Sequence, residues 1–431
     1  MNKDLLFFFL VTYSVIIYSA YSTPILLLPI LAAERSISSI CLSIIFSAFP
    51  FGAFPASIAI GKLMRFYPKD KLMLFFNIVS SFSRFTMGLL FFIEDTNLLI
   101  VIAIIARILS GIAEGALIPL IYSFIPDMFP EDIMSKYGIL EIWGSIGIAV
   151  GAPFCSFIYD QLGYFPVFAI MSSTNLIVGM IIIIVFLKSD NILSFKKEDK
   201  KSLPIKEALF SNKSILLNFF YLFIFFFPNF MIQTGYQTYM ETLTTSLYVS
   251  AGIYSLILVG MVAGVFIIKK CYSQKFERKM MFFSGMSAII ALTFYGPDPL
   301  FGITNSTAEI IIIGISFFVV GVAIEVIFLI ITKILINELG EVFHGEKELC
   351  ADFANGLFVG CFTLDQFVAP YFGSFINDYM GYERTGTFFA LIASFYFSAY
   401  WKFEAKDKKY TTMVDEIENI PDEKKLGKEQ L

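Results

Sequence analysis

Long apolar segments separated by short polar turns follow one another along most of the chain. An α-helix rises about 1.5 Å per residue, so about 20 apolar residues cross the roughly 30 Å hydrocarbon core of a bilayer. Twelve segments approach or exceed this length, at residues 5–31, 38–60, 72–93, 98–125, 137–159, 164–187, 215–240, 247–268, 280–295, 309–333, 353–376 and 385–401. The pattern therefore predicts an all-α membrane protein with twelve transmembrane helices.

One phrase occurs twice, about half a chain apart. It reads A-P-F-C-S-F-I-Y-D-Q-L-G-Y at residues 152–164 and A-P-Y-F-G-S-F-I-N-D-Y-M-G-Y at residues 369–382. Internal repeats of this kind indicate a membrane protein built from two parallel halves. We therefore divide the chain into a six-helix half at 1–187, a basic cytoplasmic linker at 188–214, a second six-helix half at 215–401 and a charged tail at 402–431 that is expected to be disordered.

Lysine and arginine gather in the loops on one side of the predicted helices. The linker alone carries seven lysines, whereas Arg35 and Arg384 are the only basic residues assigned to loops on the other side. Cytoplasmic loops retain basic residues, so both termini are expected in the cytoplasm. The loop at 296–308 has no Lys or Arg and contains the glycosylation sequon Asn305-Ser306-Thr307, which predicts a non-cytoplasmic position. This topology suits a plasma membrane and a vesicular membrane equally.

Composition excludes several other classes of protein. The chain is 57% hydrophobic and only 16% charged, far from the balance of soluble domains. Its single His and five scattered Cys have neither the spacing of metal ligands nor that of a disulfide framework. No Walker A sequence and no nucleophile–base constellation occurs. We therefore expect no enzyme, no metal, no cofactor and no nucleic-acid partner.

Three local motifs sharpen this interpretation. Gly61-Lys62-Leu63 precedes a short basic turn, Arg107 is followed by Gly111 in the fourth span, and a glycine-rich stretch with a proline follows in the fifth, comprising Gly138, Glu141, Gly144, Gly147, Gly151 and Pro153. These stretches resemble the loop 2–3 signature, the span-4 arginine motif and the glycine–proline antiporter motif of the major facilitator superfamily. Residues 61 to about 179 are most similar to its vesicular amine and polyamine branch, solute carrier family 18. The resemblance implies two six-helix halves that rock around a central substrate site.

The sequence also departs from the family pattern. Arg65 stands where an Asp is usual, Lys333 falls roughly where the branch has a carboxylate, and the first span has no Asp. These departures leave a second hypothesis open, namely a non-transporting relative that acts as a receptor or as a subunit of a membrane complex.

A charge inside a predicted span is costly and therefore points to function, and four such residues are selected as candidates. Arg84, which also lies inside a span, is assigned to packing or to the interface. Arg107 and Glu114 are seven residues apart on nearly one face of the fourth span, and Glu325 lies at the matching place in the tenth. Asp365 in the eleventh span has no obvious partner. All four are candidates for binding substrate or protons, and the two glutamates are expected to differ in proton affinity. The alternatives are an Arg107–Glu114 ion pair that only stabilises packing, and a Glu325 that is paired with Lys333.

Neutral polar residues fall on the same helices. The substrate candidates are Tyr18 and Tyr21 in the first span and Asn229, Gln233 and Gln237 around a kink expected at Pro228 in the seventh. Tyrosine rings beside carboxylates can hold an organic cation, although the aromatic residues can equally serve packing alone.

A last group of residues is expected to shape the helices. Glu141 is assigned a gate contact with loop 2–3, and Gly144, Gly147 and Gly151 should let a neighbouring helix approach closely. Pro153 and Pro370 mark matching bends in the fifth and eleventh spans. The leading hypothesis is a monomeric secondary transporter of a small organic solute, with an amine or polyamine cation as the candidate, coupled to protons and working as an antiporter.

Overall fold

The protein is all-helical in the part of the chain that the structure describes. This computed structural model describes residues 3–64, 66–129, 132–187, 213–273, 276–303, 305–342 and 347–418, which contain thirteen α-helices. The prediction of an all-α fold is confirmed. The expected linker falls mostly on residues 188–212, which lie outside the described residues.

Six helices form the first half of the molecule. Their bounds are α1 Lys3–Glu34, α2 Ser39–Leu63, α3 Lys69–Leu89, α4 Thr96–Met128, α5 Ile133–Leu162 and α6 Tyr164–Leu187. Side-chain caps explain several of the starts, because Ser38 accepts a hydrogen bond from the backbone at Cys41 and Asp95 accepts from Asn97 and Leu98. At the end of α5, Gly163 has φ 83°, a conformation that favours glycine.

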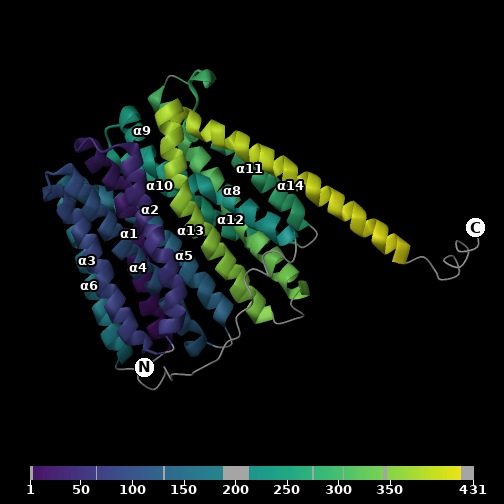
Figure 1. Cartoon of the computed structure of the whole chain (residues 1–431), viewed down its shortest axis with the longest axis horizontal. Coiled ribbons are helices and arrows are strands. Elements are labelled where there is room, and N and C mark those ends of the chain that lie inside the picture. Colours follow the sequence, from purple (N-terminus) through teal and green to yellow (C-terminus); the bar gives the residue numbers. More distant parts are fainter. Residues whose placement is uncertain are drawn as a thin grey trace, which may run out of the picture.

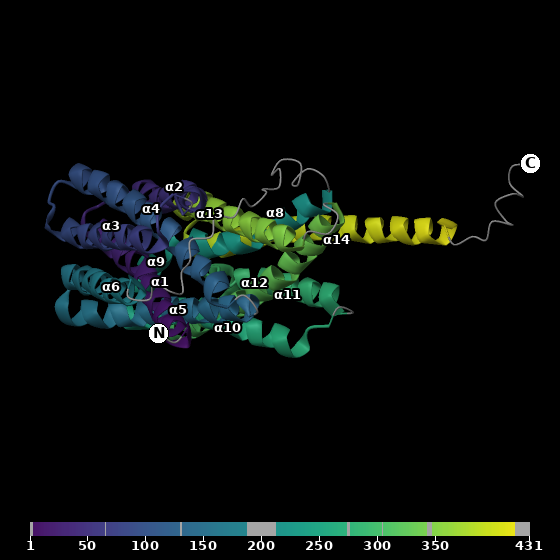
Figure 2. The same cartoon turned by 90° about the horizontal axis from the view of Figure 1, so that it is seen from below.

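The second half contains the remaining helices, side by side with the first half (Figures 1 and 2). Their bounds are α8 Lys213–Met231, α9 Tyr236–Leu243, α10 Leu247–Cys271, α11 Glu277–Leu292, α12 Ser306–Val342, α13 Lys347–Met380 and α14 Tyr382–Glu418. The predicted seventh span is interrupted three residues after Pro228, where the 3₁₀ turn η2 (Ile232–Thr234) separates α8 from α9.

Nine of the described helices, α1 to α6, α8, α10 and α12, are long and apolar enough to cross a membrane. The other three predicted spans correspond to α11, α13 and α14, and α11 has only 16 residues. The tail differs from the prediction, because α14 continues as a helix to Glu418 instead of losing structure at residue 402. A continuous helix satisfies its own backbone hydrogen bonds, so charged side chains do not by themselves end it.

Small residues let pairs of helices approach closely. A Cβ added at Gly111 of α4 would lie 2.0 Å from the carbonyl oxygen of Phe49 in α2, and one at Gly321 of α12 would lie 2.0 Å from that of Ile257 in α10. The predicted glycines of α5 lie equally close to α1. A Cβ added at Gly144 would lie 2.9 Å from the ring of Tyr18. A Cβ at Gly147 would lie 2.6 Å from the Val15 carbonyl oxygen, and one at Gly151 would lie 2.3 Å from the Ser19 carbonyl oxygen. Their close packing is confirmed.

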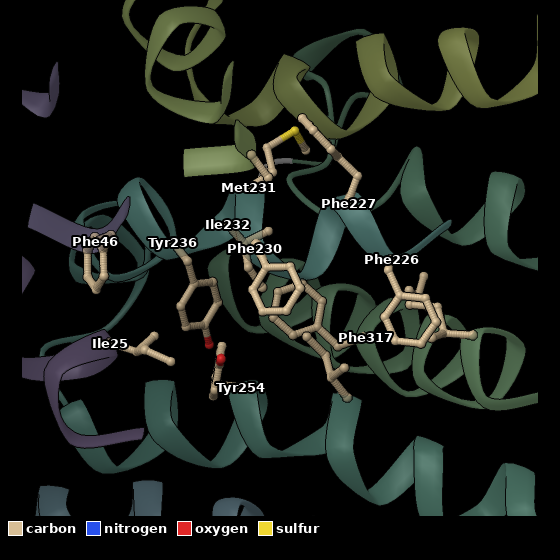
Figure 3. Packing of buried hydrophobic residues seen from close by; sticks show 14 of the residues in the cluster. Ile25, Phe46, Phe226, Phe227, Phe230, Met231, Ile232, Tyr236, Tyr254 and Phe317 are labelled. Carbon is tan, nitrogen blue, oxygen red and sulfur yellow. The ribbon is translucent and has the colours of Figure 1, made fainter. Parts of the chain in front are cut away.

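Aromatic side chains fill much of the core of the second half. Phe226 and Phe230 of α8 are buried, as is Phe317 of α12, and all three belong to the cluster drawn in Figure 3. Tyr236 of α9 continues this cluster, with its ring 5.3 Å from that of Phe317. The interruption between α8 and α9 is therefore enclosed by apolar packing.

The two copies of the repeated phrase lie where the halves meet. α13 packs against α2, and α5 packs against α10. Ser374 donates to the Ser39 carbonyl at 3.0 Å, and its counterpart Ser156 donates to the Leu247 carbonyl at 3.5 Å. Each copy then ends at a glycine with positive φ, Gly163 or Gly381. The same short phrase thus closes a helix and reaches the opposite half in both places.

Candidate functional site

A buried ion pair lies inside the first half. Nη2 of Arg84 on α3 is 2.9 Å from Oε1 of Glu114 on α4, and each side chain is only 5% exposed. Nη2 of Arg84 also donates to the Ile17 carbonyl at 3.1 Å. The sequence left open an Arg107–Glu114 ion pair as an alternative, and the structure instead pairs Glu114 with Arg84. Arg107 and Glu114 are separated by two turns of one helix, whereas Arg84 reaches Glu114 from the adjacent helix.

Arg107 is also buried, at 4% exposure, but it has no carboxylate partner among the described residues. Its guanidinium lies 4.7 Å from the ring centroid of Phe49 and 5.8 Å from that of Phe46, both on α2. Its Nε has no hydrogen-bond partner in the described part of the chain. Stacking on aromatic rings stabilises a cation but accepts no conventional hydrogen bond.

A small cavity connects these groups. It is lined by Ala20, Tyr21, Thr23, Pro24, Arg84, Met87, Arg107, Ser110, Glu114, Phe168 and Met171, from α1, α3, α4 and α6. Its space is about that of one water molecule. Three predicted residues, Tyr21, Arg107 and Glu114, thus meet at one place.

Tyr21 joins this cavity to the second half. Nε2 of Gln366 on α13 donates to the Tyr21 hydroxyl at 2.7 Å, and the side chain of Gln233 in η2 also lies in hydrogen-bonding range. The sequence prediction included Tyr21 and Gln233 but missed Gln366. The sequence did contain an indication of Gln366, because this amide directly follows Asp365 within an apolar stretch.

The other amides of the broken seventh span have different surroundings. Oε1 of Gln237 accepts from Ser250 Oγ at 2.7 Å, and its Nε2 donates to Glu241 at 3.2 Å, so this amide is held by neighbouring groups. Oδ1 of Asn229 is buried without a hydrogen-bond partner in the described residues. The structure therefore brings only Gln233 of this set to Tyr21.

A second polar cluster spans the interface of the halves. The Tyr122 hydroxyl donates to Oε1 of Glu141 at 2.6 Å, and Tyr18 is close enough to Glu141 to interact electrostatically. Glu325 on α12 also interacts electrostatically with Glu141. The gate contact expected between Glu141 and loop 2–3 stays a prediction, because Arg65 of that loop lies outside the described residues. The hydrogen bond from Tyr122 is the contact that the structure shows for Glu141.

Glu325 and Asp365 are the buried carboxyls of the second half. Glu325 is 9% exposed and has no hydrogen bond or ion pair to any described residue. Asp365 is fully buried, with Oδ1 unpartnered among the described residues and Cys361 Sγ 4.0 Å from Oδ2. Lys333, the alternative partner of Glu325, instead lies 3.6 Å from Glu277 and bonds Tyr272.

The two prolines occupy matching helices, as predicted. Pro153 lies inside α5 and Pro370 inside α13. The carbonyl of Pro370 accepts a hydrogen bond from Ser43 Oγ at 3.1 Å across the interface. A proline bend thus coincides with a contact between halves on the α13 side. The described residues contain no group of three or more side chains suited to hold a metal ion.

Comparison with known families decides the class of the protein. The sequence model of the Major Facilitator Superfamily matches residues 9–342, which is most of the chain. The chain belongs to this superfamily. It is therefore an integral, multi-pass membrane transporter of the Major Facilitator Superfamily and not an enzyme.

Curated relatives match a smaller part. MFS-type transporter SLC18B1 of Rattus norvegicus and that of Mus musculus are each 23% identical over 133 residues, which is 31% of this chain and 29% of theirs. The chain thus aligns with less than a third of the length of these relatives. The similarity agrees with the branch indicated by the span 4–5 motifs without extending to the whole transporter.

Solved structures of superfamily members share the whole fold. The nucleoside transporter NupG superposes with a TM-score of 0.72 at 13% identity, covering 93% of this chain and 99% of its own. PepTSo2 superposes with a TM-score of 0.68 at 13% identity, covering 95% and 100%. At this identity the likeness shows the fold and leaves the solute open.

Proposed function

We propose that this major facilitator protein is a proton-coupled secondary transporter of a small organic cation. One observation carries the proposal: Glu325 and Asp365 are buried in the second half without a cationic partner among the described residues. A permanently ionised carboxylate in such surroundings is costly, whereas one that alternates between a proton and a cationic solute is neutral in both states.

The cluster at the interface supports a cationic solute. Glu141 and Glu325 come from different halves, and their charges are near enough to repel each other. The Tyr122 hydroxyl donates to Glu141 at 2.6 Å, and Tyr18 is near enough for electrostatic interaction with it. Two carboxylates with adjacent aromatic rings attract an organic ammonium group by charge and by cation–π contact. Arg107 lines the small cavity, is paired with no carboxylate among the described residues, and has no part in the proposed cation binding.

The contacts between halves fit alternating access. Hydrogen bonds join α2 to α13 from Ser43 to the Pro370 carbonyl at 3.1 Å and from Ser47 to the Phe367 carbonyl at 2.8 Å. With both termini in the cytoplasm and twelve spans, these bonds fall in the non-cytoplasmic part of the molecule. We infer that they close the outer side while the cytoplasmic side is open, and that they break when the halves rock.

Transport into liposomes tests the proposal. Purified protein is reconstituted, and uptake of radiolabelled spermidine and of a labelled monoamine is followed with and without a pH gradient. Glu325→Gln and Asp365→Asn remove titration while preserving size, so at least one should lose gradient-driven accumulation yet retain exchange of bound solute. Glu114→Gln receives the same assay because Glu114 was an equal candidate in the sequence.

The matched control is Glu94→Gln, which alters an exposed carboxylate between α3 and α4 and should accumulate solute like wild type. Wild-type accumulation and pH dependence in all three buried variants would refute proton coupling through these carboxyls. Absence of uptake and of binding for every cation, with a well-folded wild type, would favour the receptor or complex-subunit hypothesis instead.

A further inference from the structure

The small cavity of the first half holds an unbalanced charge. Arg84 and Arg107 both line it, but Glu114 is the only carboxylate among its lining residues. Glu114 is engaged by Arg84 at 2.9 Å. One positive charge, that of Arg107, therefore remains without a negative partner among the described residues.

Unused hydrogen-bond donors belong to the same cavity-lining residues. Nη1 of Arg84 and Nε of Arg107 are both buried without an acceptor in the described part of the chain. The Tyr21 hydroxyl also lines the cavity, where it accepts from Gln366 and lies near Gln233. Buried donors are almost always satisfied in proteins, so the two orphaned guanidinium donors beside one excess positive charge call for an acceptor that carries negative charge.

The size and walls of the cavity narrow the choice of anion. Its space is about that of one water molecule, which is too small for an organic acid. Met87, Phe168 and Met171 supply apolar walls, which suit a weakly hydrated ion better than phosphate or sulfate. A single negative charge balances Arg107.

We propose that this cavity binds one monovalent halide, chloride in the cell, between Arg107, Arg84 and Tyr21. The ion neutralises Arg107 and accepts hydrogen bonds from donors that are otherwise orphaned. Because Tyr21 also contacts Gln366 of α13, the bound ion stabilises the arrangement in which the two halves touch at this point. The site is separate from the Glu141–Glu325 cluster and does not depend on the identity of the transported solute.

Thermal unfolding of the purified full-length protein tests the site. The midpoint is measured in sodium chloride, bromide, acetate and gluconate at equal ionic strength. A ligand that binds only the folded state raises the midpoint with its concentration, so chloride and bromide should raise it relative to gluconate. Arg107→Gln should abolish that difference. The control Arg384→Gln changes an arginine whose side chain is 54% exposed and should retain it.

A direct measurement of chloride binding tests the site even if the Arg107→Gln variant fails to fold. Wild-type protein should bind about one radioactive chloride per chain, displaced by bromide but not by gluconate. Arg107→Lys keeps the charge but loses the planar fork, so it should bind chloride about tenfold more weakly or worse. No bound chloride in wild type, an unchanged halide response in Arg107→Gln, or stabilisation by acetate but not by bromide would each overturn the proposal. None of these measurements needs a gradient, so their failure is distinct from a failure of proton coupling.

Discussion

At the scale of single residues, the first half is organised around the pair Arg84–Glu114. Both side chains are nearly removed from water, and each comes from a different helix, α3 or α4. Loss of one partner from a buried pair leaves the other charge uncompensated. The resulting decrease in the free energy of unfolding is larger than the net contribution of the intact pair to stability. The pair is therefore a sensitive point for stability whether or not it takes part in transport.

Glu114→Gln should lower the free energy of unfolding by about 3–5 kcal/mol, because Arg84 is left buried with a neutral partner. The double variant Arg84→Gln/Glu114→Gln should recover part of this loss. Unfolding in mixed micelles, followed by circular dichroism, measures both. Two outcomes would contradict the assignment: a Glu114→Gln variant as stable as wild type, or a double variant no more stable than Glu114→Gln.

Sequence periodicity located these charges but not their partners. The seven-residue spacing correctly placed Arg107 and Glu114 on one side of α4, since both line the same cavity. The true partner of Glu114 depends on the register between α3 and α4, which no local pattern encodes. The same holds for Lys333, whose contacts with Glu277 and Tyr272 come from the end of α10 and the start of α11.

At the scale of elements, glycine sets the distance between helices. The sequence motif pointed to the glycines of α5, but the reciprocal contacts of α2 with α4 and of α10 with α12 were not predicted. Those glycines belong to different spans, so their role can be recognised only when it is known which helices are neighbours. A kink was expected at Pro228, but α8 runs on to Met231 and the break follows at η2. Proline disturbs the turn that precedes it, so Pro228 indicated that this span is irregular without locating the break.

Two glycines of α2 provide a matched test of this packing. A Cβ at Gly52 would lie 2.3 Å from the Ile108 carbonyl of α4, whereas one at Gly61 would meet nothing within 4 Å. Gly52→Ala should therefore destabilise the protein by about 1–3 kcal/mol. Gly61→Ala should be neutral or stabilising by up to about 1 kcal/mol, since alanine favours the helix. Thermal unfolding in detergent compares them, and equal midpoints for the two variants would show that α2 and α4 are not in close contact.

At the scale of the whole molecule, the internal repeat relates the two contacts between halves. α5 and α13 carry its two copies, and each packs on the helix of the second predicted span of the opposite half, α10 or α2. The repeat was evident in the sequence, and so was the general architecture. The contacts made by Ser156 and Ser374 could be identified only from the structure, because a repeated sequence does not show which residues it contacts in the fold.

Cysteine accessibility tests the orientation of the chain in its membrane. Leu300 is 87% exposed, between α11 and α12, and Cys271 is exposed at the end of α10. In sealed cells, an impermeant maleimide should label Leu300→Cys but leave the native Cys271 unlabelled, because the two lie on opposite sides. Permeabilised cells serve as the control and should show both labelled. Labelling of Cys271 alone in sealed cells would reverse the assigned topology.

The length of α14 has a practical consequence for studying this protein. The helix has 37 residues, about 55 Å at 1.5 Å per residue, against a hydrocarbon core of about 30 Å. Figures 1 and 2 show it projecting well beyond the other helices as a straight rod. Residues 402–418 alone extend about 25 Å. A rigid marker protein fused in helical register to this rod would stand clear of a detergent micelle and give electron microscopy a fixed landmark for aligning particles.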